Sequence, residues 1–136
     1  VASARRRLEA AEGPVARLFW IEACHSTLAL ALLPEHRGRV AMTTFNFGYL
    51  PGGDKSLTTK CASSLEAVEA SLDWTMPGGV VSLAIYPGHP EGAQEAIALT
   101  AWAEGLDPRR FHALQYRFLN LVNDPPFVIA IEKALA

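Results

Sequence analysis

The order of strand-like and helix-like segments along the 136-residue chain restricts its fold more than any other feature. Apolar runs typical of strands alternate with amphipathic or Ala-rich runs typical of helices. The chain then ends in two strand-like segments, 111–119 and 127–133, with no helix between them. Because the connection 120–126 is too short for a crossover helix, we expect these two strands to pair antiparallel. The sequence predicts one α/β domain over residues 1–136 that ends in a β-hairpin.

Hydrophobic periodicity, together with Gly and Pro stop signals, predicts the other elements. The expected helices are 2–11, 25–33, 63–75 and 91–104, and the expected strands are 15–21, 39–45 and 80–86. Pro34 should end the second helix, and the Pro-Gly-Gly run that begins at Pro77 should end the third. The strand 80–86 is a mainly apolar run, which is typical of a strand covered on both faces.

Charge gives little support for binding to nucleic acid through the whole surface. Half of the residues are hydrophobic, 19% are charged and the formal net charge is −2, an ordinary globular balance without a global positive field. Any RNA contact would need a local patch. The candidates are 5–7 (three arginines), Lys55 with Lys60, and 109–110 (two arginines) with Arg117, and the alternative for each is a solvated surface.

Cysteine and hydropathy patterns predict a cytoplasmic protein. Cys24 and Cys61 form neither a disulfide framework nor a paired metal motif, so reduced thiols are expected. No apolar run approaches the ~20 residues that span a membrane, and no apolar segment follows the N-terminal arginines as in a signal peptide. A zinc site built from Cys24, His25, Cys61 and His89 would lack a C-x-x-C anchor, so we expect no metal.

The stretch 46–55 (NFGYLPGGDK) directly follows the expected strand 39–45 and carries the most specific signal for a functional site. Asn46 offers an amide that can accept a hydrogen bond from an amino group, and Tyr49 offers a ring that can stack on a base. Ligands of open α/β sheets bind at the carboxyl ends of the strands, where this loop should lie. A planar, nitrogen-bearing substrate is therefore expected beside it.

Two other enzyme classes fit the sequence less well. Residues 48–56 approach a phosphate-binding loop, but Asp54 separates Gly53 from Lys55, and an acidic side chain repels phosphate. A Ser/His/Asp hydrolase would need a Gly-x-Ser-x-Gly elbow, and the sequence has none.

Several short stretches together form a pattern that is specific to one family: 46–55 (NFGYLPGGDK) with 58–60 (TTK), 86–90 (YPGHP), 118–120 (FLN), and 123–127 (NDPPF) with 131–133 (IEK). Through these stretches the chain resembles a family of class I S-adenosylmethionine-dependent methyltransferases. This is the small bacterial group labelled "putative rRNA methylase", whose members are assigned to methylating an aminomethyl-uridine at the tRNA wobble position. The resemblance implies a Rossmann-like sheet in which the final strand lies between the strands 80–86 and 111–119.

The resemblance also implies methyl transfer from S-adenosylmethionine to an amine on RNA, with tRNA as the expected partner. Residues 46–49 resemble the Asn-Pro-Pro-Tyr corner of amino-group methyltransferases, in which the amide orients the amine and the ring holds the base. Asn46, Tyr49, Asp54 and His89 are the implied catalytic residues, with Asp54 or His89 accepting the proton of the amine. The alternatives are a turn residue for Asp54 and a loop residue between prolines for His89.

Further residues are assigned by the same resemblance to binding. The expected cofactor contacts are His25, Asn46 and Gly48. The expected substrate or RNA contacts are Tyr49, Gly52, Gly53, Lys55, Thr59, Lys60, Arg117, Asn120 and Asn123. For the two asparagines, the alternative is a turn-forming role in the final hairpin.

The sequence departs from the family pattern upstream of these motifs. It carries neither the Gly-rich turn that cradles the methionine part of the cofactor nor the strand ending in an acidic residue that holds the ribose. It has Ala23-Cys24-His25 where relatives have Asp-Gly-His. We expect a methyltransferase sheet truncated at the N-terminus, with strands 1 and 2 absent, from a fragment or a miscalled start. The exposed strand edges could then form a homodimer, and an inactive remnant that acts as a binding module is the alternative function.

Overall fold

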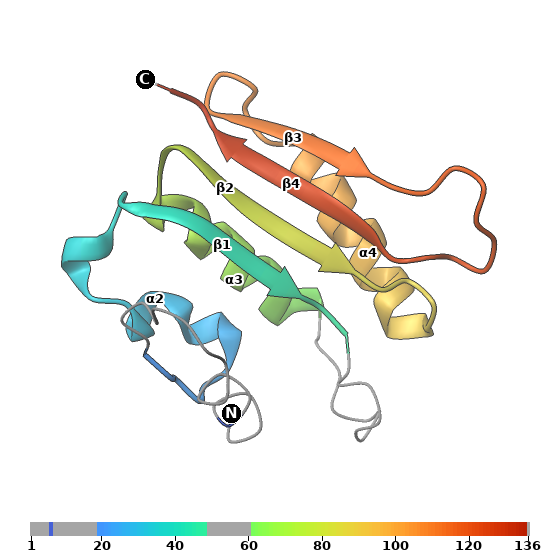
Figure 1. Ribbon diagram of the computed structural model, residues 1–136, viewed down its shortest axis with the longest axis horizontal. Helices are drawn as coiled ribbons and strands as arrows, with labels where there is room; N and C mark the ends of the chain where they lie inside the picture. The colour runs from blue at the N-terminus through green and yellow to red at the C-terminus, as the bar shows by residue number, and fades with distance from the viewer. Residues whose placement is uncertain (1–5, 7–18, 49–60, 136) are drawn as a thin grey trace.

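The computed structural model describes residues 6, 19–48 and 61–135, which form a sheet backed by two long helices (Figure 1). The elements are η1 (His25–Thr27), α2 (Leu28–Ala31), η2 (Pro34–His36), β1 (Val40–Asn46), α3 (Cys61–Trp74), β2 (Thr75–Ile85), α4 (Pro90–Glu104), β3 (Phe111–Tyr116) and β4 (Phe127–Lys133). None of the described helices is both long and apolar enough to cross a membrane.

The four described strands form one sheet in the order β1-β2-β4-β3. β1 pairs with β2 in parallel, whereas β4 is antiparallel to both β2 and β3. The predicted antiparallel hairpin is therefore confirmed, and so is the insertion of the final strand between β2 and β3. Within the described residues β1 and β3 are the two edges of the sheet.

One face of the sheet packs on α3 and α4, which lie behind it in Figure 1. Alternate residues of each strand point to opposite faces, so β2 turns Val81, Leu83 and Ile85 toward the helices. These three side chains are fully buried and form one cluster with apolar residues of all four strands and both helices. Each such side chain contributes roughly 1.5–3 kcal/mol through burial, so this face is the main source of stability.

The start of β2 differs from the sequence expectation. We expected Pro77 to Gly79 to lie between a helix and a strand, but α3 ends at Trp74 and β2 begins at once with Thr75. The register with β1 shifts between Val40, opposite Thr75, and Met42, opposite Val80, so the Pro-Gly-Gly run forms an irregular insertion within the strand. Gly79 is required there because a Cβ would lie 3.0 Å from the Ala41 carbonyl oxygen.

Other elements are shorter than expected or lie partly outside the described residues. The predicted helix 25–33 is a 3₁₀ turn followed by the four-residue α2, and the predicted strand 111–119 ends at Tyr116. Of the expected strand 15–21, residues 19–21 are irregular and 15–18 lie outside the described part. Phe19 and Ile21 are exposed, so the apolar pattern of this segment did not predict its burial. Of the expected helix 2–11, Arg6 is described and is helical.

Candidate functional site

The carboxyl ends of β1, β2 and β3 lie at the same end of the sheet (Figure 1). Three segments leave the strands at this end: 47–48 after β1, 86–89 between β2 and α4, and 117–126 between β3 and β4. Ligands of open α/β sheets bind at the carboxyl ends of the strands, and we therefore treat this end as the candidate site.

The end of β1 is fixed by the side chain and backbone of Phe47. Its N–H donates to the Ala84 carbonyl oxygen at 3.0 Å, which extends the pairing with β2 beyond Asn46. Its buried ring stacks on Phe45, with centroids 5.3 Å apart, and meets the edge of His25 at 6.0 Å. Phe45 and Phe47 thus anchor the strand end in the core, whereas Asn46 between them is exposed on the opposite face.

Gly48 brings the segment after β1 against the segment after β2. Its φ of 125° is in a region that side chains rarely adopt. A Cβ on this glycine would lie 3.8 Å from the Tyr86 Cβ and 4.0 Å from His89 Nε2. The predicted residues Asn46, Gly48 and His89 therefore lie on adjoining segments at the carboxyl ends of β1 and β2.

His89 and Gly92 hold the segment 86–89 against the first turn of α4. His89 is the N-cap of α4, and its Nδ1 accepts a hydrogen bond from the Gly92 N–H at 3.1 Å. A Cβ on Gly92 would lie only 2.1 Å from the Tyr86 carbonyl oxygen, so this close approach requires glycine. We missed this residue in the sequence, where its place two positions after Pro90 is the available signal.

The cap bears on the predicted role of His89 as a proton acceptor. With Nδ1 accepting from Gly92, the neutral ring carries its hydrogen on Nε2, so a further proton would have to bind Nδ1 and break the cap. Glu91 lies beside the same ring nitrogen at 3.4 Å. A hydrogen bond from its own backbone N–H lowers the pKa of the Glu91 carboxyl.

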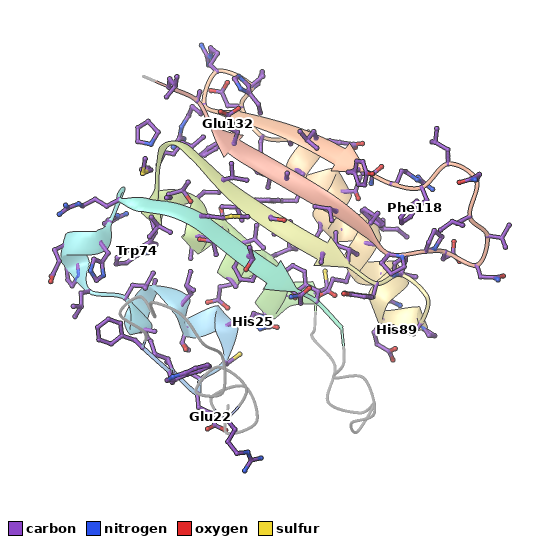
Figure 2. The ribbon with its side chains drawn as sticks, in the orientation of Figure 1. Glu22, His25, Trp74, His89, Phe118 and Glu132 are labelled. Atoms are coloured by element: carbon purple, nitrogen blue, oxygen red, sulfur yellow. The ribbon has the colours of Figure 1, made fainter. Side chains whose placement is uncertain are left out.

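His25 begins η1 and lies beside the end of β1, where Figure 2 labels it. Its Nε2 is buried and has no hydrogen-bond partner among the described residues. A buried polar atom without a partner is costly, and it marks a position where a ligand could supply the missing bond. On the neighbouring Cys24, a hydrogen bond from the Ser26 hydroxyl at 3.2 Å lowers the pKa of the thiol.

The β3–β4 connection reaches the turn that follows β2. Asn123 and Asp124 have positive φ angles of 64° and 47°, and the Asp124 carbonyl oxygen lies 4.0 Å from where a Cβ on Gly88 would be. The predicted RNA contacts Arg117 and Asn120 are exposed on this connection, as is Asn123. The turn-forming alternative fits the backbone of Asn123.

A buried pair between the two long helices was also missed. Ser64 in the first turns of α3 donates a hydrogen bond to Glu95 of α4, and both residues are 1% exposed or less. Glu95 lies four residues before Leu99 and eight before Ala103 on the buried stripe of α4, and this spacing was visible in the sequence.

The remaining predicted site residues are Tyr49, Gly52, Gly53, Asp54, Lys55, Thr59 and Lys60, which lie outside the described residues. Within the described part of the chain, no group of three or more His, Cys, Asp or Glu side chains could hold a metal ion.

Comparisons with known proteins point to one family. The family model described as "Putative rRNA methylase" matches residues 1–132. The chloroplastic tRNA (mnm(5)s(2)U34)-methyltransferase of Arabidopsis thaliana is 36% identical over 110 residues, which make up 81% of this chain and 39% of the plant protein.

Solved structures show the same fold. A "putative rRNA-methylase" from Clostridium thermocellum matches 83% of this chain and 59% of its own length, with a TM-score of 0.77 and 28% identity. A "putative methyltransferase" from Streptococcus mutans, solved in complex with SAH, matches 80% and 57%, with a TM-score of 0.70 and 29% identity. The chain thus spans less than two thirds of the length of these relatives. It belongs to the rRNA methylase family of α/β methyltransferase-like proteins.

Proposed function

We propose that this chain carries the acceptor side of an S-adenosylmethionine-dependent N-methyltransferase whose substrate is the aminomethyl group of a tRNA wobble uridine. The observation that carries the proposal is the exposed Asn46 amide at the carboxyl end of β1, beside Gly48 and the His89 turn. The match to the plant tRNA methyltransferase supports the choice of substrate.

The residues present contribute mainly by positioning. The Asn46 side-chain oxygen can accept a hydrogen bond from the amine and so fix the direction of its lone pair. Holding two reacting groups in a productive geometry supplies much of the rate enhancement when no covalent intermediate is needed. Asp54 is our proposed proton acceptor, because accepting a proton would cost His89 its cap on Gly92. Tyr49 is proposed to stack on the uracil ring.

The described residues fit part of a cofactor site. Nε2 of His25 is buried and has no partner among the described residues. The His25 ring contacts Phe47 at the end of β1, and Asn46 and Gly48 are the chain neighbours of Phe47. His25, Asn46 and Gly48 would hold S-adenosylmethionine, which supplies the methyl group when bound. A polar ligand atom that bonds to His25 would remove the cost of its unsatisfied nitrogen.

Calorimetric titration of S-adenosylmethionine into the chain tests the cofactor contacts. We expect saturable binding that Asn46→Ala weakens by about tenfold, the effect of one lost hydrogen bond of ~1.4 kcal/mol. Asn120→Ala is the matched control, because it removes an exposed amide from the β3–β4 connection and should leave binding unchanged.

A methyl-transfer assay with tRNA then separates the enzyme from the binding-module alternative. A folded chain that binds RNA but neither binds S-adenosylmethionine nor transfers its methyl group would contradict the proposed activity and favour the binding module. Sedimentation of the same samples reports whether two copies associate through their strand edges, as proposed from the exposed edges of the sheet.

A further inference from the structure

Two aromatic side chains are exposed at the end of β3, next to the candidate site. Tyr116 is the last residue of the strand and Phe118 follows on the connection to β4, where Figure 2 labels it. Their side chains are 68% and 50% exposed, and their rings meet edge to face with centroids 6.5 Å apart and an angle of 62°. Each ring therefore supports the other and still keeps surface open to a ligand.

The register of the sheet relates Tyr116 to Asn46. Asn46 is opposite Ala84, Ala84 is opposite Val128, and Val128 is opposite Tyr116. Residues paired directly across strands turn their side chains to the same face, so these four form one row on the face away from α3 and α4. Neighbouring strands lie about 4.8 Å apart, which separates the Asn46 and Tyr116 backbones by ~14 Å along this row.

The charge on this surface favours a ligand that carries phosphates. Arg117 lies between the two aromatic residues, is exposed, and has no ion pair within the described part of the chain. By contrast, Arg109 is paired with Asp107 and Arg37 with Asp73. Aromatic rings next to an unpaired cation are the usual means of binding single-stranded nucleic acid, because bases stack on the rings and the cation contacts the backbone.

We propose that Tyr116 and Phe118 form a stacking surface for unpaired RNA bases and that Arg117 contacts the phosphate between them. The inference rests on the proposed function and deepens it. Bases next to the one that receives the methyl group would lie over β3 while the target base lies at the end of β1. Asn46 and Tyr116 then bind the same RNA strand at two points.

A second copy of the chain is the other possible occupant, and charge argues against it. An unpaired guanidinium that becomes buried in an interface between two copies is costly. Arg117 forms no ion pair among the described residues. A solvated RNA phosphate satisfies the guanidinium without that cost.

The test is fluorescence anisotropy of the full chain with a labelled oligouridine of about ten nucleotides, within the size range of single-strand sites. Tyr116→Leu and Phe118→Leu keep an apolar side chain but remove the ring, and each should weaken binding about fivefold or more. Tyr116→Phe keeps the ring and should restore most of the affinity. Arg117→Gln should weaken binding and lower the slope of log affinity against log salt by about one.

Two variants serve as matched controls. Ile97→Ala removes an exposed apolar side chain from α4. Arg39→Gln removes an exposed cation just before the first residue of β1, at the other end of the strands. Neither should change the affinity for oligouridine or its salt dependence. Circular dichroism of each variant checks that the fold is retained.

Several results would overturn the inference: wild-type chain that does not bind oligouridine, unchanged affinity in Tyr116→Leu, or an equal loss in Ile97→Ala. A dimer that Tyr116→Leu dissociates would assign the surface to a second copy. Methyl transfer to tRNA that persists unchanged in Tyr116→Leu overturns this inference alone. RNA binding that depends on Tyr116, together with no methyl transfer by the wild-type chain, overturns the proposed function alone.

Discussion

Replacing Gly92 by Ala is expected to destabilise the fold because the first turn of α4 has no room for a side chain at this position. A Cβ at this position would lie 2.1 Å from the Tyr86 carbonyl oxygen, whereas an ordinary contact begins at 3.4 Å. Backbone would have to move by about 1.3 Å in a segment that the His89 cap also holds. Forced overpacking of this kind costs about 1–3 kcal/mol.

The same helix supplies a matched control at its other end. Gly105 has a φ of −82°, which any residue adopts, and a Cβ there would lie 3.5 Å from the Trp102 carbonyl oxygen. Gly105→Ala should therefore leave stability unchanged or raise it by up to about 1 kcal/mol, because it restricts the unfolded chain.

Urea unfolding followed by circular dichroism measures both variants. We expect Gly92→Ala to lower the midpoint at an unchanged slope, since the change acts on stability rather than on the surface exposed by unfolding. Stability of Gly92→Ala within ~0.5 kcal/mol of wild type, or an equal loss in Gly105→Ala, would refute the account of the turn.

Lys133→Met should lower the free energy of unfolding by about 1.5–3 kcal/mol in urea titrations, because the ammonium donates to the carbonyl oxygens of Leu72 in α3, at 3.0 Å, and of Thr75 in β2, at 2.8 Å. An unchanged midpoint would show that water replaces these bonds. Ser64→Ala should cost about 1–3 kcal/mol because it removes a hydroxyl that donates to the buried Glu95 carboxyl; wild-type stability would contradict this. The Arg109 side chain lowers the pKa of Asp107, so their interaction stabilises the fold above about pH 4 and is lost as the pH falls through the lowered pKa. Asp107→Asn should therefore flatten the acid side of the stability–pH curve, and a curve identical to wild type would exclude this contribution.

The fold was predictable where the hydrophobic periodicity agreed with the Gly and Pro stop signals. The short connection between the last two strands was sufficient to predict the hairpin, because it leaves no room for a crossover helix. The beginning of β2 was not predictable, since Pro77 to Gly79 usually end an element and here form an irregular insertion that the pairing with β1 stabilises. The apolar residues Phe19 and Ile21 led us to predict a strand, but residues 19–21 are irregular and both side chains are exposed. An apolar pattern does not show which strand would pair with the segment.

The candidate site was predictable in part. Asn46, Gly48 and His89 were found from motifs and lie on adjoining segments. Tyr116 and Glu95 were missed, the first because tyrosines are intermediate in burial and the sequence does not show whether one is exposed, and the second because acidic residues are usually exposed. Only the register of the sheet relates Tyr116 to Asn46, and no local pattern carries that information.

The most direct test of the central claim is transfer of labelled methyl groups from S-adenosylmethionine to tRNA. The assay should compare the chain alone with a chimera in which it replaces the matched part of the Clostridium thermocellum protein. We predict that the chimera transfers methyl groups to a tRNA bearing aminomethyl-uridine. Asn46→Ala in the chimera should lower the transfer rate by about a hundredfold or more and leave the melting temperature unchanged. A folded chimera without transfer, or an Asn46→Ala variant as active as wild type, would contradict the assignment of the acceptor site to the carboxyl ends of the strands.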